Sequence, residues 1–253
     1  MISVGKCLYG KNGKKIYPTL DNYENVIVIS KGRTKHKALS PFYLTDDQGR
    51  IMENYWQFCK VYKEVPKTKQ LVSRYDQTIT WDHPKEVHVE KQNGVERIND
   101  KYKSWREKGM KNKYPVRYPV GSKNVHKCIG ALPYKLNSDG SESTEIDESV
   151  LLDYISSRKR IYIKKYSELA KKSPLFQELV DKLKQGKNLL IIDVDGPHEE
   201  SLDYYKKKYN VGDNFIQNNT VFIDKNNIQI LLNDEKHPFG HGYCLAMCLL
   251  GKE

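Results

Sequence analysis

The stretch from Asn188 to His198 constrains the fold of this chain more than any other. It contains an apolar run, Leu189 to Val194, in which Asp193 is the one polar residue. Such a run is typical of a strand buried on both faces in the middle of a parallel sheet. Asp195, a Gly-Pro turn and a histidine follow it. Because open α/β sheets bind ligands beyond the carboxyl ends of their strands, we expect a functional site at this edge.

The rest of the chain alternates between strand and helix patterns. Asn25 to Ser30 is a second β-branched run and predicts another central strand, while Asn12-Gly13 predicts a short hairpin. Further strands are predicted at 220–224 and 228–232, and helices at 53–62, 144–155, 158–172, 173–185, 199–209 and 242–250. The sequence therefore predicts an α/β (or α+β) fold, a single domain over residues 1–253 whose mixed central sheet is flanked by helices. The polar segment 136–143 marks a subdomain seam at most.

Composition bounds the class of protein. The chain has 253 residues, a formal net charge of +11 and a pI of about 9.2. This excess favours encounter with nucleic acids, nucleotides or anionic surfaces, although lysines spread over the whole surface are the simpler explanation. The five cysteines have neither disulfide-framework nor zinc-site spacing. Without a signal peptide or an apolar run of roughly 18 residues, we expect a reduced, cytoplasmic protein that has no membrane partner.

Two carboxylates end the central strand. Asp193 and Asp195 lie on the same face of it, because side chains of a strand alternate with a period of two. Such a pair can hold a divalent metal, or one carboxyl group can serve as a general acid. His198 is the candidate base beside them. The alternative is turn chemistry, in which the Asp195 side chain accepts hydrogen bonds from neighbouring backbone donors.

A second polar segment, Asn233 to Tyr243, follows the predicted strand at 228–232. Its turn Gly240-His241-Gly242 opens the last helix, where glycine lets backbone N–H groups approach a phosphate or carboxylate. His237 and His241 are candidates for proton transfer, and Lys31 and Arg33 are candidate phosphate partners. The alternative is that the glycines only permit close packing of the helix.

Cys244 lies in the first turn of that last helix, where the helix dipole favours a thiolate. A nearby histidine could activate it and Asp234 could orient the histidine, which is the arrangement of a cysteine-nucleophile hydrolase. The alternative is a buried structural thiol, because the helix is apolar all round.

The segment from Lys101 to Lys127 is the most basic part of the chain. It holds nine Lys or Arg residues, one acid (Glu107) and interleaved aromatic residues. Phosphate contacts and base stacking need this combination. The candidate nucleic-acid-binding residues are Lys101, Lys103, Trp105, Arg106, Lys111, Lys113 and Arg117. The alternative is a lysine-rich surface whose aromatic side chains anchor it to the core.

Three segments resemble uncharacterised proteins of large DNA viruses of the mimivirus type: Arg158 to Ile163, Gly186 to Leu189 and Asp193 to Pro197. The resemblance covers mostly residues 150–250 and implies no activity. A viral chain would reside in the host cytosol or the virion. The order of elements is also similar to small α/β domains of nucleotide-handling systems, although Gly240-His241-Gly242 stands where those have a Cys-His-Gly turn.

Three hypotheses of different classes follow. The first is a hydrolase that acts on a nucleotide or nucleic acid, at a phosphate or N-glycosidic bond, through an Asp/His pocket at strand ends. Asp193 and Asp195 would hold a divalent metal if one is used. The second is a basic nucleic-acid-binding accessory protein without catalysis, and the third is the cysteine-nucleophile hydrolase. No motif in the sequence defines the substrate, the cofactor or the oligomeric state.

Overall fold

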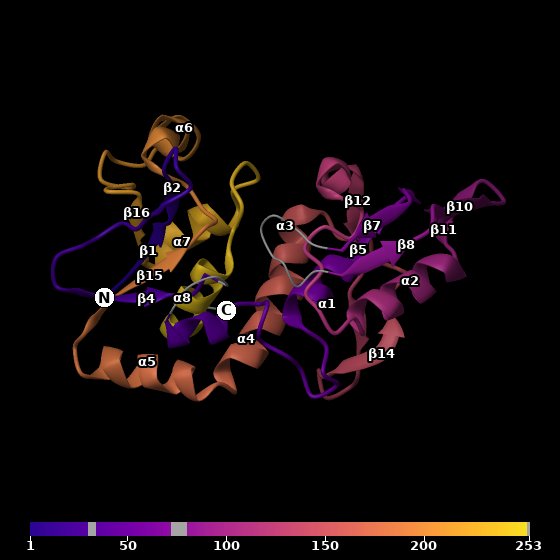
Figure 1. Cartoon of the computed structure of the whole chain (residues 1–253), viewed down its shortest axis with the longest axis horizontal. Coiled ribbons are helices and arrows are strands. Elements are labelled where there is room, and N and C mark those ends of the chain that lie inside the picture. Colours follow the sequence, from indigo (N-terminus) through magenta and orange to yellow (C-terminus); the bar gives the residue numbers. More distant parts are fainter. Residues whose placement is uncertain (30–33, 72–79, 252–253) are drawn as a thin grey trace. The chain divides into compact units, whose positions relative to one another are not determined.

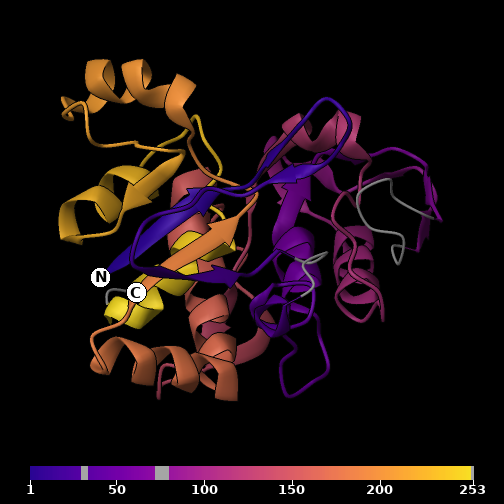
Figure 2. The same cartoon turned by 60° about the vertical axis from the view of Figure 1, so that its left-hand side comes forward.

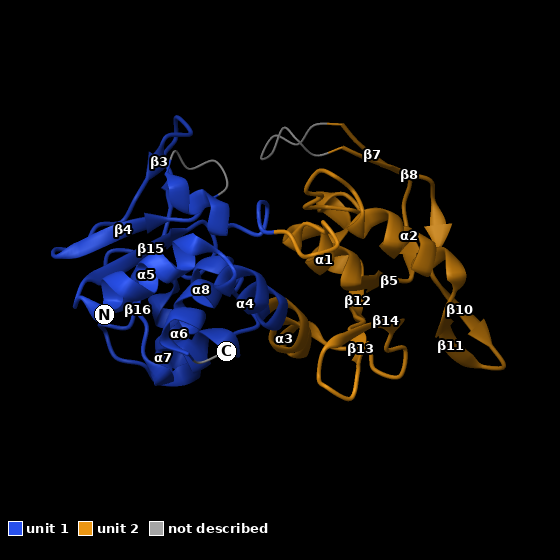
Figure 3. Cartoon of the chain, turned by 90° about the horizontal axis from the view of Figure 1, so that it is seen from below, with its two compact units in different colours: residues 1–44, 163–253 blue, residues 45–162 orange. Residues whose placement is uncertain are grey.

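The computed structural model describes residues 1–29, 34–71 and 80–251, which form the mixed α/β fold that the sequence predicts. The chain divides into two compact units (Figure 3). Unit 1 comprises Met1–Leu44 and Ile163–Glu253, and unit 2 comprises Thr45–Tyr162. The segment 136–143, where we expected a subdomain seam at most, lies within unit 2.

A four-stranded mixed sheet forms the centre of unit 1 (Figure 1). Its strands, in spatial order, are β16 (Thr220–Phe222), β1 (Ile2–Lys6), β15 (Asn188–Asp193) and β4 (Tyr23–Ile27). β15 pairs in parallel with β1 and β4, whereas β16 runs antiparallel to β1. The side chains from Leu189 to Ile192 are fully buried, so β15 is the buried central strand that its apolar run predicts.

The C-terminal helix covers one face of this sheet. α8 (His241–Leu250) contacts β1 and β15, and α4 (Lys164–Lys171) and α5 (Pro174–Lys184) pack against it. Figure 2 shows the yellow α8 lying against the orange β15. On the opposite face, Leu190 and Ile192 form a small core with Cys7 and Ile29. The buried α8 confirms the apolar helix predicted at 242–250.

Several other predictions for unit 1 are confirmed. The Asn12-Gly13 hairpin joins two short antiparallel strands, and the helix start at Ser173 is present because its side chain accepts a hydrogen bond from the N–H of Leu175. The remaining elements are β2 (Leu8–Tyr9), β3 (Lys15–Ile16), η1 (Lys35–Leu39), η4 (Glu199–Ser201), α6 (Leu202–Tyr209) and α7 (Lys225–Leu232).

One strand prediction for unit 1 was wrong, and another was right about the strand but not about its central place in the sheet. The segment 228–232 lies in the helix α7, whose N-terminus is capped by the Asp224 side chain, which accepts from the N–H groups of Asn226 and Asn227. Its buried residues fall at helical spacing, so the short apolar run has a period of 3.6 and not of two. The strand expected at 25–30 is β4, which within the described residues pairs on one side only and is an edge strand.

An aromatic core holds unit 2 together. α1 (Met52–Cys59) packs against α2 (Asp100–Met110), and the rings of Phe58, Trp81 and Trp105 lie against one another between them. The strands are β5 (Lys60–Tyr62), β6 (Glu64–Val65), β7 (Thr68–Gln70), β8 (Trp81–His83), β9 (Glu86–Val87), β10 (Val89–Gln92), β11 (Val95–Ile98), β12 (Cys128–Ala131), β13 (Tyr134–Leu136) and β14 (Glu142–Ile146). The other helical segments are η2 (Ser122–Lys127), α3 (Tyr154–Ser157) and, at the end of the unit, η3 (Arg158–Ile163).

The helix predicted from Thr144 onward was also wrong. Residues 142–146 form β14, which pairs with β13 in a hairpin. The turn between them contains Gly140 at a φ of 82°, and Asp139 accepts a hydrogen bond from the N–H of Ser141. This turn returns the chain antiparallel, so the helix starts only at α3, where Asp153 caps it by accepting from the N–H of Ser156.

Spanning a bilayer takes a helix of about 20 predominantly apolar residues. Among the residues that the structure describes, no helix has that length and composition.

Candidate functional site

The two turns that the sequence singles out in unit 1 contact each other through Asp193. Its Oδ2 accepts a hydrogen bond from the N–H of Gly242 at 2.9 Å, and its Oδ1 accepts one from the N–H of Val194 at 2.7 Å. Nδ1 of His241 lies 3.3 Å from the same Oδ2. The carboxylate is fully buried. Asp193 therefore connects the end of β15 to the N-terminus of α8.

Glycine is required where the turns meet. A Cβ atom on Gly240 would lie 2.3 Å from Oδ2 of Asp193 and 2.6 Å from Cβ of Asp195. A Cβ on Gly242 would lie 2.9 Å from Cβ of Asp193. The close approach predicted for these glycines is therefore real, but the Gly242 N–H that was expected to bind an external anion donates to a carboxylate of the chain itself.

His241 is engaged at both ring nitrogens. Its Nε2 lies 2.9 Å from the carbonyl oxygen of Val28, which can only accept, so this nitrogen carries a proton and donates. Its Nδ1 faces Asp193, and the residue is 6% exposed. This arrangement anchors α8 to the sheet, and it presents neither ring nitrogen to a substrate.

Lys6 belongs to the same strand edge, although the sequence analysis missed it. It stands opposite Asp193 in the β1–β15 register, and its Nζ donates to the carbonyl oxygen of Gly196 at 2.7 Å. Burial lowers the pKa of Lys6, while Asp195 and Asp193 act in the opposite direction. Only the strand pairing reveals this neighbour, because Lys6 is almost 190 residues away in sequence.

Asp234 and His237 form a separate cluster with two tyrosines of α6. Asp234 accepts hydrogen bonds from Tyr204 at 2.7 Å and from Tyr205 at 2.5 Å, and His237 Nδ1 lies 2.7 Å from its Oδ2. Burial raises the pKa of Asp234, but these hydrogen bonds outweigh it and lower the pKa to about 2. His198 lies at the start of η4, where its N–H donates to Ser201.

The remaining predicted residues of unit 1 do not form an accessible nucleophile or a metal site among the described residues. The Cys244 side chain is fully buried in α8, so a substrate has no access to the thiol, as the structural alternative predicts. Within the described ranges, no three His, Cys, Asp or Glu side chains are grouped as metal ligands, Asp193 and Asp195 included. Lys31 and Arg33 lie outside the described residues.

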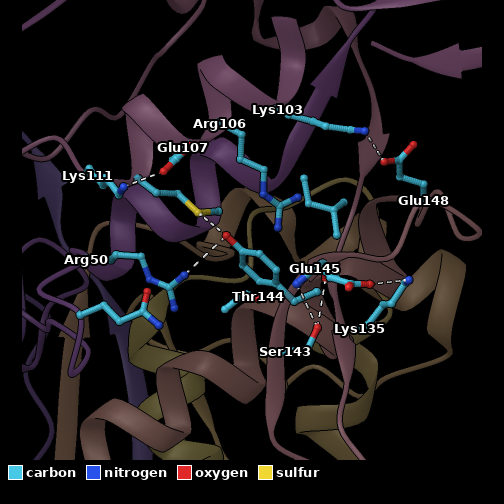
Figure 4. A pocket seen from close by; sticks show the side chains of 14 residues that line it. Arg50, Lys103, Arg106, Glu107, Lys111, Lys135, Ser143, Thr144, Glu145 and Glu148 are labelled. Atoms are coloured by element: carbon cyan, nitrogen blue, oxygen red, sulfur yellow. Dashed lines mark hydrogen bonds and ion pairs between the residues drawn. The ribbon is translucent and has the colours of Figure 1, made fainter. Parts of the chain in front are cut away.

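Unit 2 contains a cavity of about 590 Å³, which we call the basic cavity (Figure 4). Helix α2 forms one wall and the β13–β14 hairpin another, and five cationic side chains line it: Arg50, Lys103, Arg106, Lys111 and Lys135. Three of these come from the basic segment that the sequence predicts. Arg50 and Lys135 come from elsewhere in the chain, which is why the sequence pattern did not include them.

Arg106 differs from the other cations of this cavity. The residue is 1% exposed, and its Nη1 donates to the carbonyl oxygen of Leu132 at 2.7 Å. Its Nε and Nη2 are buried without a hydrogen-bond partner, and no carboxylate of the described residues lies within ion-pair distance. The guanidinium carbon lies 4.4 Å from the centroid of the Tyr134 ring. A permanently charged group thus lies at the cavity wall with two unsatisfied donors.

The other four cations have carboxylate partners. Arg50 donates to Asp46 at 2.7 Å. The lysine pairs are Lys103–Glu148 at 2.9 Å, Lys111–Glu107 at 2.6 Å and Lys135–Glu145 at 2.7 Å. The lysine pairs are exposed to solvent, where water screens their attraction, so an incoming anion can compete with the glutamates.

The other residues predicted for nucleic-acid binding do not line the basic cavity. Trp105 was wrongly expected to stack on bases, since it is 1% exposed and packs against Phe58 in the core. Lys113 and Arg117 lie over the rings of the adjacent tyrosines, Tyr114 and Tyr118, and Lys101 is exposed on α2.

Comparison with known proteins gives no relative to guide the choice between the two units. No protein-family model matches the chain, and no curated protein matches it. No solved structure matches its fold.

Proposed function

We propose that this protein binds a phosphate-bearing ligand of nucleotide size in the basic cavity of unit 2. The observation that carries this proposal is the buried guanidinium of Arg106, whose Nε and Nη2 have no partner. A buried charge without a counter-charge costs several kcal/mol, and a bound anion would offset that cost. The volume of about 590 Å³ lies within the range of cavities that take small organic ligands.

Tyr134 connects the charge to the cavity. Its ring lies against Arg106, and the guanidinium carbon of Arg50 lies 5.5 Å from the same ring. A phosphate in the cavity would attract both arginines through space. A small movement of the Tyr134 ring would bring the phosphate into contact with the unsatisfied Nε–H and Nη2–H groups of Arg106. Arginine suits this role because its planar fork can donate two hydrogen bonds to one phosphate.

This proposal selects one part of the expected function. A nucleotide and the end of a nucleic-acid strand both carry the required phosphate. A cavity with one buried arginine suits a single phosphate group better than the repeated phosphates of a long nucleic acid. Hydrolysis at Asp193 and His241 gains no support from their geometry, because both side chains are buried and hydrogen-bonded within the chain.

The test is isothermal titration calorimetry with inorganic phosphate, AMP and ATP on the wild type and on Arg106→Met. Methionine keeps most of the side-chain length without the charge. Charge-assisted hydrogen bonds contribute about 1.5–3 kcal/mol each, so we expect the variant to bind at least about 10-fold more weakly. Arg117→Met removes the same charge outside the cavity and should leave the affinity within about twofold.

Two outcomes would contradict the proposal. If none of the three probes binds the wild type at low salt, the basic cavity is not a phosphate site. If a folded Arg106→Met binds as tightly as the wild type, the phosphate lies elsewhere. Binding of a short single-stranded oligonucleotide, but not of ATP, would instead favour the accessory-protein hypothesis.

A further inference from the structure

A second and smaller cavity of unit 2 surrounds the amine of Lys60. It has a volume of about 320 Å³, and we call it the Lys60 cavity. Trp56 and Tyr154 provide aromatic walls, Val125 and Ile129 add apolar surface, and Cys128 lines it from β12. Apolar walls around a few polar groups are typical of sites for small organic ligands. None of these residues lines the basic cavity.

A chain of buried polar groups leads along α1 to this amine. Nε2 of Gln57 donates to Oε1 of Glu53 at 2.9 Å, and Nζ of Lys60 donates to Oε1 of Gln57 at 2.9 Å. Glu53 is 6% exposed and Gln57 is 8% exposed. Burial of a carboxylate and an amide costs free energy unless both are hydrogen-bonded, as Glu53 and Gln57 are on α1. Here they fix the Lys60 side chain in one conformation.

Burial favours the neutral amine of Lys60 over the ammonium form. The Trp56 ring, whose centroid lies 4.8 Å from Nζ, acts in the opposite direction, because the face of an aromatic ring attracts a cation. Burial lowers the pKa of Lys60, while Cys128, Glu53 and Cys59 act in the opposite direction. Asp153 places a carboxylate on the wall of the Lys60 cavity, where its side chain caps the N-terminus of α3. A neutral amine is a nucleophile, and lysines of this kind form imines with carbonyl compounds.

We propose that the Lys60 cavity binds a small carbonyl compound with a planar ring and that Nζ of Lys60 forms an imine with it. The lone pair of the neutral amine attacks the carbonyl carbon, and one amine proton moves to the carbonyl oxygen to give a carbinolamine. The hydroxyl group then leaves as water together with the second amine proton, and a C=N bond to Nζ remains. No oxidant or reductant takes part in this step, and the ring of the ligand lies between Trp56 and Tyr154.

The test is reductive trapping with benzaldehyde and sodium cyanoborohydride at pH 7, read by peptide mass spectrometry. Cyanoborohydride reduces the imine to a stable secondary amine. Lys63 is the internal control, because it lies three residues away and its side chain is 58% exposed. We expect Lys60 to be labelled at least about 10-fold faster than Lys63, and this ratio to fall as the pH rises toward 10 and all lysines become neutral.

Variants separate the amine from its surroundings. Lys60→Arg should lose the label at this position and keep it at Lys63. Gln57→Leu, which removes the acceptor of the Nζ hydrogen bond, should reduce the ratio severalfold. Trp56→Leu should abolish the preference for benzaldehyde over propanal. Labelling of Lys60 at or below the rate of Lys63 in the wild type would overturn the proposal, whatever the variants do.

Discussion

Replacement of Asp193 by alanine separates a structural role of the strand edge from a catalytic one. The substitution leaves the buried N–H groups of Val194 and Gly242 without their acceptor, and it removes the group that faces Nδ1 of His241. Each unsatisfied buried donor costs about 1–3 kcal/mol, so the two N–H groups together cost about 2–6 kcal/mol. We therefore expect unit 1 to lose about 2–6 kcal/mol of its free energy of unfolding.

The assay is thermal unfolding followed by circular dichroism and by differential scanning calorimetry. A unit of this size loses about 3–4 °C of Tm per kcal/mol, so the Asp193→Ala transition should fall by about 6–24 °C. Asp195→Ala is the matched control: Asp195 is only half-buried, and we expect its variant to lose less than half as much. Calorimetry matters because the two units can unfold separately, and only one transition should move.

The result decides what kind of residue Asp193 is. A catalytic carboxylate is commonly held at some cost in stability, so its removal leaves the Tm unchanged or raises it. If the transition of Asp193→Ala lies within about 2 °C of the wild type, the hydrogen bonds described above do not hold α8 to the sheet. The hydrolase hypothesis would then regain its strongest residue.

Three further predictions concern other parts of the chain. Gly109→Ala should destabilise unit 2 by more than about 2 kcal/mol in urea unfolding, because the new Cβ would lie 2.0 Å from the Phe58 ring. Alanine is normally the better helix residue, and the control Ser104→Ala on the exposed face of α2 should not destabilise the unit. Asp234 has a folded pKa of about 2 against its ordinary 3.8, so its ionised form adds about 2 kcal/mol to the free energy of unfolding. This stabilisation is fully present above about pH 5 and is lost as the pH falls to 2, and Asp234→Asn should lack this part of the acid sensitivity in urea titrations at pH 5 and 2. Glu148→Gln removes a carboxylate from the basic cavity and should tighten phosphate binding a fewfold in calorimetry, most clearly at low salt; unchanged values in any of these would count against the corresponding contact.

The elements that the sequence predicted well are those whose signals are local. The apolar run of β15, the Ser173-Pro174 start of α5 and the apolar α8 each depend on residues within one segment. The hypothesis of an Asp/His pocket expected the turns at Asp193 and His241 at neighbouring strand ends. The turns do contact each other, although the second one follows the helix α7 and not a strand. The hydrogen bond between the two turns could not be predicted, because it depends on the exact relative placement of residues about 50 positions apart in sequence.

The errors arose where a local signal competes with distant pairing. Thr144 resembles a helix cap, yet the turn at Asp139 and Gly140 folds the segment back onto β13. The run at 228–232 is too short for its period to be read with certainty, and the capping side chain of Asp224 decides in favour of a helix. The boundaries of the units at 44/45 and 162/163 were not predicted, because no local pattern shows that unit 2 is inserted between two parts of unit 1.

The basic cavity shows why a basic segment alone does not define a binding site. All three lysines that line it pair with glutamates, and such exposed pairs are common on any lysine-rich surface. Arg106 is different because its charge is buried and two of its donors are unsatisfied, a condition that lowers the stability of unit 2. Residues that break the rules of a stable core are expected mainly at functional sites, where a ligand supplies the missing partner. The burial of Arg106, more than the net charge of +11, is therefore the feature that points to an anionic ligand.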